Sequence, residues 1–197
     1  TFNPSNTVLT ATYTPSAAEL SAGLVNLSLT STSNGSCNSV NDQVLIVFNN
    51  APTVNAGLDV SSCKNNAATA LSGVVSGTTT TGIWTGGAGA FSPSNTNLNA
   101  TYTPNAAELA AGSVTLTLTS TSNANCNAVT DKMIINFTPS PVVNAGVDLS
   151  VCQNNPLAVL SGSVSGGSTT GIWSGGNGTF NPSNSVLTAS YTPDRKS

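Results

Sequence analysis

The sequence predicts an all-β protein of tandem immunoglobulin-like β-sandwich repeats with a period of 89 residues. Short segments alternate β-branched or apolar residues with polar ones, and turn formers separate them at regular spacing. The sequence also repeats itself. Trp84 and Trp173 are 89 residues apart, and successive tyrosines at Tyr13, Tyr102 and Tyr191 are separated by the same distance. Periods of about 20 to 50 indicate solenoids or propellers, whereas one near 90 is the size of a self-contained domain.

The period divides the chain into three parts. Residues 1–50 are the C-terminal half of one repeat, 51–139 are a complete repeat, and 140–197 are the N-terminal part of a third. The linker at 138–141 is short and contains two prolines, so we expect it to be semi-rigid. Because the first residue falls inside a repeat and is not Met, we expect an excerpt of a longer, processed protein.

The first half of the complete repeat predicts three strands. Residues 54–60 form an edge-like strand broken by Gly57, residues 70–75 a second strand, and residues 83–84 a third. Trp84 is expected at the centre of the core, where such a sandwich usually places one large aromatic. The alternative is that Trp84 stacks on a sugar. The same core role is assigned to the recurring aromatics Trp173, Tyr13, Tyr102 and Tyr191.

The second half predicts one helical turn among further strands. Phe91 begins a short strand, and residues 98–102 alternate at period 2 until Pro104 ends them. Asn105 can cap a short helix while Glu108 reaches back to it, and Gly112 can close it. Residues 114–119 and 133–137 complete about seven strands, the number an immunoglobulin-like sandwich needs.

Composition excludes several function classes. Only 6% of the 197 residues are charged, and four Lys and Arg cannot neutralise a run of phosphates, so we expect no nucleic-acid partner. No apolar run approaches the roughly 20 residues of a membrane helix, so no membrane insertion is expected. The chain has no His to serve as a base, and its acids recur singly, once per repeat; we therefore expect no enzyme.

The recurring motifs carry a resemblance across the whole chain. They are Val-Asn-Ala-Gly-x-Asp, Leu-Ser-Gly-x-Val, Gly-Ile-Trp, Phe-x-Pro-Ser-Asn, Tyr-Thr-Pro, Ala-Ala-Glu-Leu and Cys-Asn-x-Val, in fixed order. Together they resemble the tandem Ig-like (PKD-like) repeats of giant secreted, gliding-type surface adhesins of Bacteroidetes-type bacteria. The resemblance implies an extracellular location, cell-surface or secreted, and a role as stalk or filament.

The leading hypothesis is therefore a structural repeat region of a large secreted bacterial surface adhesin, whose partners are neighbouring repeats of the same chain. A carbohydrate-binding Ig-like module and accessory repeats of a secreted hydrolase are the alternatives. The surface or polysaccharide ligand stays open. The half-repeats are explained either by an excerpt from a longer chain or by head-to-tail self-assembly, in which the tail of one molecule completes the head of the next.

The four cysteines indicate disulfides, since the chain has no His and no CxxC pair for zinc. One hypothesis pairs Cys63 with Cys126 inside the complete repeat, so that Cys37 and Cys152 have partners in the parts of their own repeats that lie outside this sequence. In a standard immunoglobulin topology, however, those two loops lie at opposite ends. The alternative pairs Cys37 with Cys63 and Cys126 with Cys152 across the junctions. Either hypothesis fits an oxidising, extracellular setting.

No cofactor is expected, with calcium as a weaker alternative. Asp59 and its counterpart Asp148 follow the motif Asn-Ala-Gly near a junction and could join a calcium site. Calcium takes six or more oxygen ligands, and carboxylates are scarce in this chain. The plainer interpretation is that each Asp caps a turn.

Overall fold

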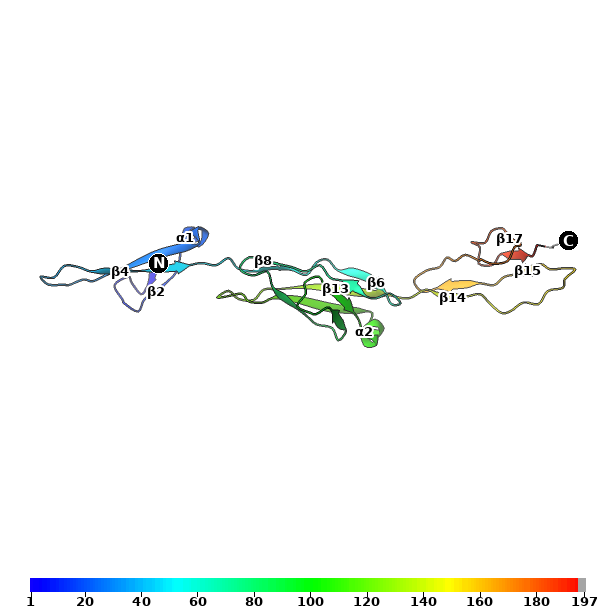
Figure 1. The fold of residues 1–197 in the computed structure, drawn as a ribbon, viewed down its shortest axis with the longest axis horizontal. Coiled ribbons are helices and arrows are strands. Elements are labelled where there is room, and N and C mark those ends of the chain that lie inside the picture. Colours follow the sequence, from blue (N-terminus) through cyan, green and yellow to red (C-terminus); the bar gives the residue numbers. More distant parts are fainter. Residues whose placement is uncertain (195–197) are drawn as a thin grey trace.

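The computed structural model describes residues 1–194, which form three units in a row along the longest axis (Figure 1). The chain is 38% strand and 6% helix, so the all-β prediction is confirmed. The last three residues of the predicted third part, 195–197, lie outside the described residues.

The elements repeat in the same order. The first unit holds β1 (Phe2–Asn3), β2 (Thr12–Tyr13), α1 (Ala17–Ala22), β3 (Leu24–Thr30) and β4 (Asn41–Val47). The middle unit holds β5 (Thr53–Asn55), β6 (Val60–Cys63), β7 (Thr69–Ala70), β8 (Val74–Ser76), β9 (Gly82–Thr85), β10 (Ala90–Ser92), β11 (Thr101–Thr103), α2 (Ala106–Ala111), β12 (Ser113–Ser120) and β13 (Thr130–Thr138). The third unit holds β14 (Val142–Asn144), β15 (Ala158–Val159), β16 (Ser163–Ser165), β17 (Thr179–Asn181) and β18 (Ser190–Thr192).

The middle unit is a sandwich of two layers. One layer has the order β6-β13-β12-β9, and the other contains β10-β11-β7 and the pair β5-β8. β7 and β8 belong to one extended stretch, interrupted at residues 71–73. There the N–H groups of Leu71 and Gly73 donate to the carbonyls of Ala100 and Leu98, at 2.8 and 3.0 Å, which continues the pairing through the gap.

The first predicted strand is in fact two strands in different layers. β5 pairs antiparallel with β8, whereas β6 pairs parallel with β13, where Val60 lies opposite Ile135. Between them Gly57 has φ +88°, a left-handed conformation that glycine adopts without steric cost. The edge segment therefore crosses from one layer to the other and completes the edges of both.

The core lies between the layers. Trp84, Tyr102, Leu116, Leu118 and Ile135 are fully buried. Along β12 and β13 buried and exposed residues alternate, as expected when one face of a sheet packs and the other is solvated. The indole N–H of Trp84 donates to the carbonyl of Leu98 at 3.2 Å, which satisfies its one polar group inside the core.

Both helices have a capping box, which the sequence predicts for residues 105–108. In α2 the Asn105 side chain accepts from the N–H of Glu108 and the Glu108 side chain accepts from the N–H of Asn105, each at 2.9 Å. Gly112 closes the helix with φ +86°. α1 has the same box and a glycine at its end. Within residues 1–194 no helix is both long and apolar enough to cross a membrane.

The partial units contain the same sequence text but cannot complete the same sheets. Residues 171–174 repeat the Gly-Ile-Trp text of β9, yet they form no strand. β9 pairs only with β12, and the described residues of the third unit include no counterpart of β12. Conversely, Leu29 is 61% exposed in the first unit, whereas its counterpart Leu118 is 0% exposed.

We expect the Leu118→Ala substitution to lower the free energy of unfolding of the middle unit by about 2–5 kcal/mol, the usual cost of a cavity at a fully buried leucine. Urea unfolding, followed by the fluorescence of Trp84 in a Trp173→Phe background, measures this. Leu29→Ala is the matched control and should leave that transition unchanged. Equal losses for the two variants would contradict the assignment of the core.

Candidate functional site

The recurring glycine-rich bend carries a cluster of polar groups around Tyr102. The hydroxyl of Tyr102 donates to Glu108 Oε1 at 2.6 Å and accepts from the N–H of Gly89 at 2.9 Å. The N–H of Ala88 also donates to Glu108 Oε1, at 2.7 Å. The cluster thus ties the bend after β9 to β11 and to the first turn of α2.

The pKa values of Tyr102 and Glu108 indicate a structural hydrogen bond between them and no proton transfer at neutral pH. Burial, and then the hydrogen bond to Glu108, raise the pKa of Tyr102 to about 12. Burial acts to raise the pKa of Glu108, but the hydrogen bonds from Tyr102 and from the backbone N–H groups outweigh it and lower that pKa. At pH 7 the carboxylate therefore stays charged and the phenol stays neutral, so this geometry is a clasp rather than an acid–base pair.

The same cluster explains why glycines recur in the bend. A Cβ atom on Gly87 would collide with the hydroxyl of Tyr102, and one on Gly176 would collide with the hydroxyl of Tyr191. In the first unit the hydroxyl of Tyr13 donates to Glu19 Oε1 at 2.5 Å, so the tyrosine–glutamate bond is present there as well. The glycines of the bend are therefore required so that the tyrosine hydroxyl can reach its glutamate, a contact we call the tyrosine clasp.

Two aspartates form a second clasp, where the edge segment crosses between layers. Asp59 Oδ1 accepts from the N–H of Ile134 at 2.8 Å, and Asp131 Oδ2 accepts from the N–H of Ala56 at 2.9 Å. The N–H groups of Ala56 and Lys132 lower the pKa of Asp131. The crossing segment between β5 and β6 and the strand β13 thus each supply a carboxylate that accepts from the backbone of the other.

The structure does not gather oxygens around the calcium candidates. Asp59 is used in the clasp, and Asp148 is exposed in the third unit. Among residues 1–194 no three His, Cys, Asp or Glu side chains come together in a way that could hold a metal ion. Asp59 instead accepts from the N–H of Ile134 on β13, 75 residues further along the chain, which is a long-range contact and not the cap of a local turn.

Neither predicted cysteine pairing fits this arrangement. All four thiols are free. The thiol of Cys63 donates to the carbonyl of Pro139 at 3.7 Å, beyond the end of β13, and Cys126 precedes the start of β13. The nine residues of β13 therefore separate them, about 26 Å at the usual rise per residue, whereas disulfides need Cα atoms within about 7 Å.

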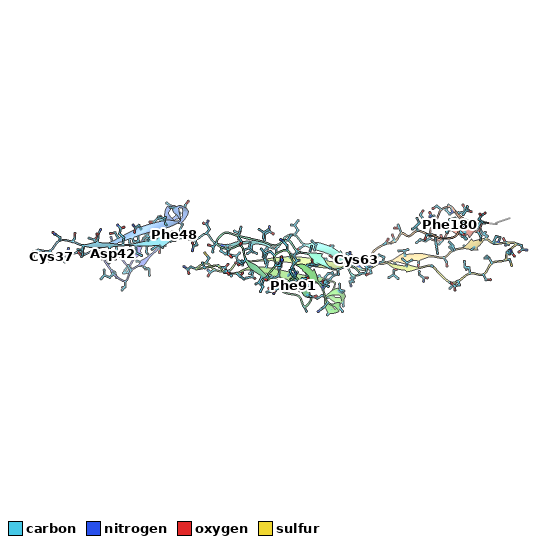
Figure 2. The ribbon with its side chains drawn as sticks, viewed as in Figure 1. Cys37, Asp42, Phe48, Cys63, Phe91 and Phe180 are labelled. Atoms are coloured by element: carbon cyan, nitrogen blue, oxygen red, sulfur yellow. The ribbon has the colours of Figure 1, made fainter. Side chains whose placement is uncertain are left out.

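The alternative pairings, Cys37 with Cys63 and Cys126 with Cys152, do not fit this arrangement either. Cys37 and Cys63 lie at distant places along the row of units (Figure 2). Cys126 meets the first linker, with its thiol 3.8 Å from the carbonyl of Asn50, whereas Cys152 bridges to Asn155 inside the third unit. Each cysteine marks one end of its repeat, and the hypotheses paired opposite ends.

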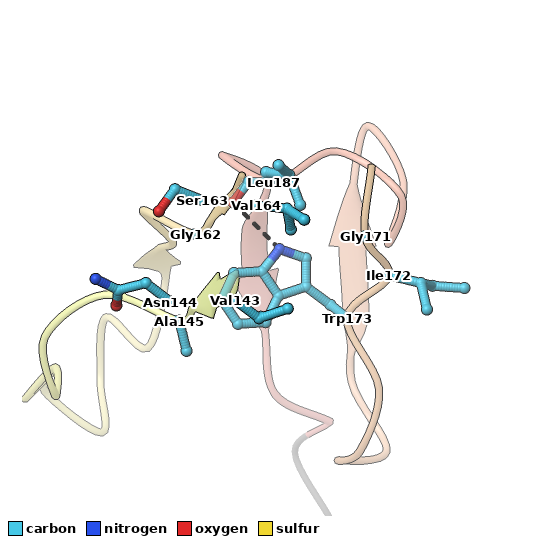
Figure 3. Close-up of a pocket in the computed structure, with 10 residues that line it drawn as sticks. All are labelled: Val143, Asn144, Ala145, Gly162, Ser163, Val164, Gly171, Ile172, Trp173 and Leu187. Carbon is cyan, nitrogen blue, oxygen red and sulfur yellow. Dashed lines mark hydrogen bonds between the residues drawn. The ribbon is translucent and has the colours of Figure 1, made fainter. Parts of the chain in front are cut away.

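A cavity of about 140 Å³ opens beside Trp173 in the third unit (Figure 3). Val143, Val164, Ile172 and Leu187 are among its lining residues. As in the middle unit, the indole N–H donates to a backbone carbonyl, here that of Leu187 at 3.2 Å. The cavity is largely apolar, which on its own would suggest a small-molecule site.

Comparison with the middle unit gives the cavity a different explanation. There, a Cβ atom on Gly73 would lie 2.7 Å from Leu118 and 2.8 Å from Trp84, so leucine and indole meet over that glycine. At the counterpart, Gly162, the nearest atoms are those of Trp173 and Leu187, with no leucine of the Leu118 type. The cavity beside Trp173 is the seat that this leucine fills in a complete repeat.

No family model matches the sequence, and no curated protein is similar to it. The solved structures that it resembles include the extracellular domain of protocadherin GammaB4 (14% identity, TM-score 0.38), covering 88% of this chain and 32% of that one. Another is extracellular cadherin domains 3–6 of protocadherin Gamma B2 (13% identity, TM-score 0.38), covering 91% and 53%. The chain spans about a third to a half of these proteins, and likenesses this weak carry no argument about function.

We expect the middle unit to lose stability as the pH falls below about 4. The folded-state pKa values of Asp131 and Glu108 are lowered, so their contribution is present above the unfolded-state pKa and disappears as the pH falls toward the folded-state value. Thermal unfolding between pH 7 and pH 2 measures the slope. Asp131→Asn should flatten it, whereas Asp42→Asn, at the matching position of the first unit, should not. An unchanged slope in Asp131→Asn would refute the aspartate clasp.

Proposed function

We propose that this chain is a structural repeat region, a stalk or filament, of a large secreted bacterial surface adhesin. One observation carries the proposal: the polar side chains that recur from repeat to repeat bond to the repeat's own backbone. Glu108 and Asp59 both use their oxygens in this way. Recurrence is then explained by the needs of folding, and we propose no enzymatic activity.

The linkers support a stiff, extended arrangement. Gly77 and Gly166 both have positive φ, and a Cβ atom on either would collide with a linker carbonyl, that of Ala51 or of Ser140. Each linker thus packs against the repeat that follows it. A strand pair then begins at once, with Thr53 opposite Ser76 and Val142 opposite Ser165. The linkers therefore contain few residues that are free to bend. Because only 6% of the residues are charged, added salt has few electrostatic interactions to screen.

The aromatic side chains argue against the carbohydrate-binding alternative. Trp84 and Tyr102 are fully buried, and the ring of Phe91 packs against Tyr102 with centroids 4.8 Å apart. A sugar-stacking platform needs an exposed aromatic face, which these residues do not offer. Saturable binding of the chain on a polysaccharide array would nevertheless favour that module, and a catalytic domain elsewhere in the full-length protein would favour the hydrolase accessory.

A stalk predicts a fixed increment of length for each added repeat. If residues 51–139 are inserted once more after Pro139, small-angle scattering should show a longest dimension increased by the length of one middle unit. The increment should be the same in low and in high salt. An inserted chain that grows in cross-section instead of length would count against the stalk.

The partial units favour a second element of the proposal, head-to-tail association of copies. The third unit has an open seat beside Trp173, and the first unit has an exposed leucine, Leu29, at the position of the leucine that fills the seat. β3 and β4 already pair as β12 and β13 do, so they present a ready-made hairpin. Because residues 1–19 and 179–197 repeat the same region, one copy of that region must be displaced for the hairpin to dock.

We expect the chain to self-associate with rising concentration, in sedimentation equilibrium from micromolar to millimolar. Leu29→Asp should weaken association at least tenfold, because a charge would enter the apolar seat. Asn26→Asp is the matched control, since the counterpart of Asn26 faces solvent on β12, and should leave it unchanged. A chain that stays monomeric throughout would exclude head-to-tail association and leave the stalk proposal standing.

A further inference from the structure

The two linkers of the chain are built alike on both sides. Residues 49–52 and 138–141 occupy matching positions of the period. On the preceding side, the N–H of Phe48 donates to Gly23 and that of Phe137 to Gly112, both at 2.8 Å. On the following side, Gly77 and Gly166 lie so close to matching linker carbonyls that a Cβ atom on either would collide with them. A contact seen at one junction can therefore be transferred to the other.

The second junction shows where the cysteine of the preceding repeat lies. Cys63 ends β6 and pairs with Thr138, the last residue of β13. The N–H of Lys64 donates to the carbonyl of Thr138 at 3.0 Å, which fixes the turn beside the linker. The thiol of Cys63 then donates to the carbonyl of Pro139 at 3.7 Å.

The first junction shows where the cysteine of the following repeat lies. The thiol of Cys126 is 3.9 Å from the carbonyl of Asn49 and 3.8 Å from that of Asn50. Asn50 and Pro139 are counterparts in the period. The two cysteine types therefore approach the same linker carbonyl, one from each side of a junction.

Both contacting cysteines are partly buried, whereas Cys37 and Cys152 are exposed. Each junction in this chain holds one member of the pair, because the other would stand in the part of the neighbouring repeat that this sequence does not include. When both members are placed on one linker, the sulfurs are at most about 7.5 Å apart (3.7 Å plus 3.8 Å). To form the bond, the two side chains must turn toward each other until the sulfurs are about 2 Å apart, with the Cα atoms within about 7 Å.

We propose that, wherever two complete repeats of this kind follow one another, the Cys63 of the first and the Cys126 of the second form a disulfide across the linker. Two S–H bonds break and one S–S bond forms. A low-molecular-weight disulfide such as oxidised glutathione takes the two electrons and leaves as two thiols, after a mixed disulfide with one of the cysteines. The bond gives each junction a second covalent connection beside the chain itself, and it does not depend on the adhesin assignment.

The test uses the chain in which residues 51–139 are inserted once more after Pro139, so that it contains two complete repeats. In the first variant all cysteines are replaced by Ser except Cys63 of the first repeat and Cys126 of the inserted one. The matched variant keeps Cys63 and Cys126 of the first repeat. A third variant keeps Cys126 of the first repeat and Cys63 of the inserted one. Each is oxidised with glutathione disulfide while dilute, and free thiols are counted on the monomer.

We expect the first variant to lose both thiols and to fall in mass by two hydrogens, with its tryptophan fluorescence unchanged. The other two variants should keep both thiols, because their cysteines lie at opposite ends of one repeat or of two. Retention of both thiols in the first variant would overturn the proposal. Loss of both in the matched variant would also overturn it, because it would establish a bond within one repeat.

Discussion

The fold depends on the contact of Leu118 with Trp84. The two residues lie opposite one another where β12 pairs with β9, and both are completely buried. The opposing layer fits over them only because residue 73 is glycine: a Cβ atom there would lie within 3 Å of both side chains. Within their own layer, a Cβ atom on Gly82 of β9 would lie 3.1 Å from Leu118. Where the leucine is lacking, in the third unit, the Trp-bearing segment forms no strand and a cavity opens.

The sequence could predict those features that depend only on residues close together in the chain. The capping boxes of α1 and α2 lie within four residues, and the alternation along β12 is local as well. Those predictions required only helix-end chemistry and a period of two. Tyr102 is also buried, and its recurrence with Glu108 was visible in the sequence.

What the sequence could not predict depends on residues brought together from far apart. The first predicted strand is split because β6 pairs with β13, about 75 residues later in the chain. No local sequence pattern indicates such a parallel partner. Asp131 recurs as Asp42, but its bond to Ala56 spans 75 residues, so its role in the clasp is visible only in the fold. The cysteine pairings depend on the end of the sandwich at which each loop emerges, which the positions of cysteines along the sequence do not reveal.

The parallel pairing of β6 with β13 has a mechanical consequence. β6 lies near the start of the repeat and β13 ends it, and the two run in the same direction over four residue pairs, from Val60↔Ile135 to Cys63↔Thr138. A pull on the two ends of the repeat draws these strands in opposite directions along their own length. The hydrogen bonds between them are then loaded together in shear, instead of opening one after another as in a peeled hairpin. Tension along the row of repeats is therefore resisted first at the place where the chain enters and leaves each sandwich.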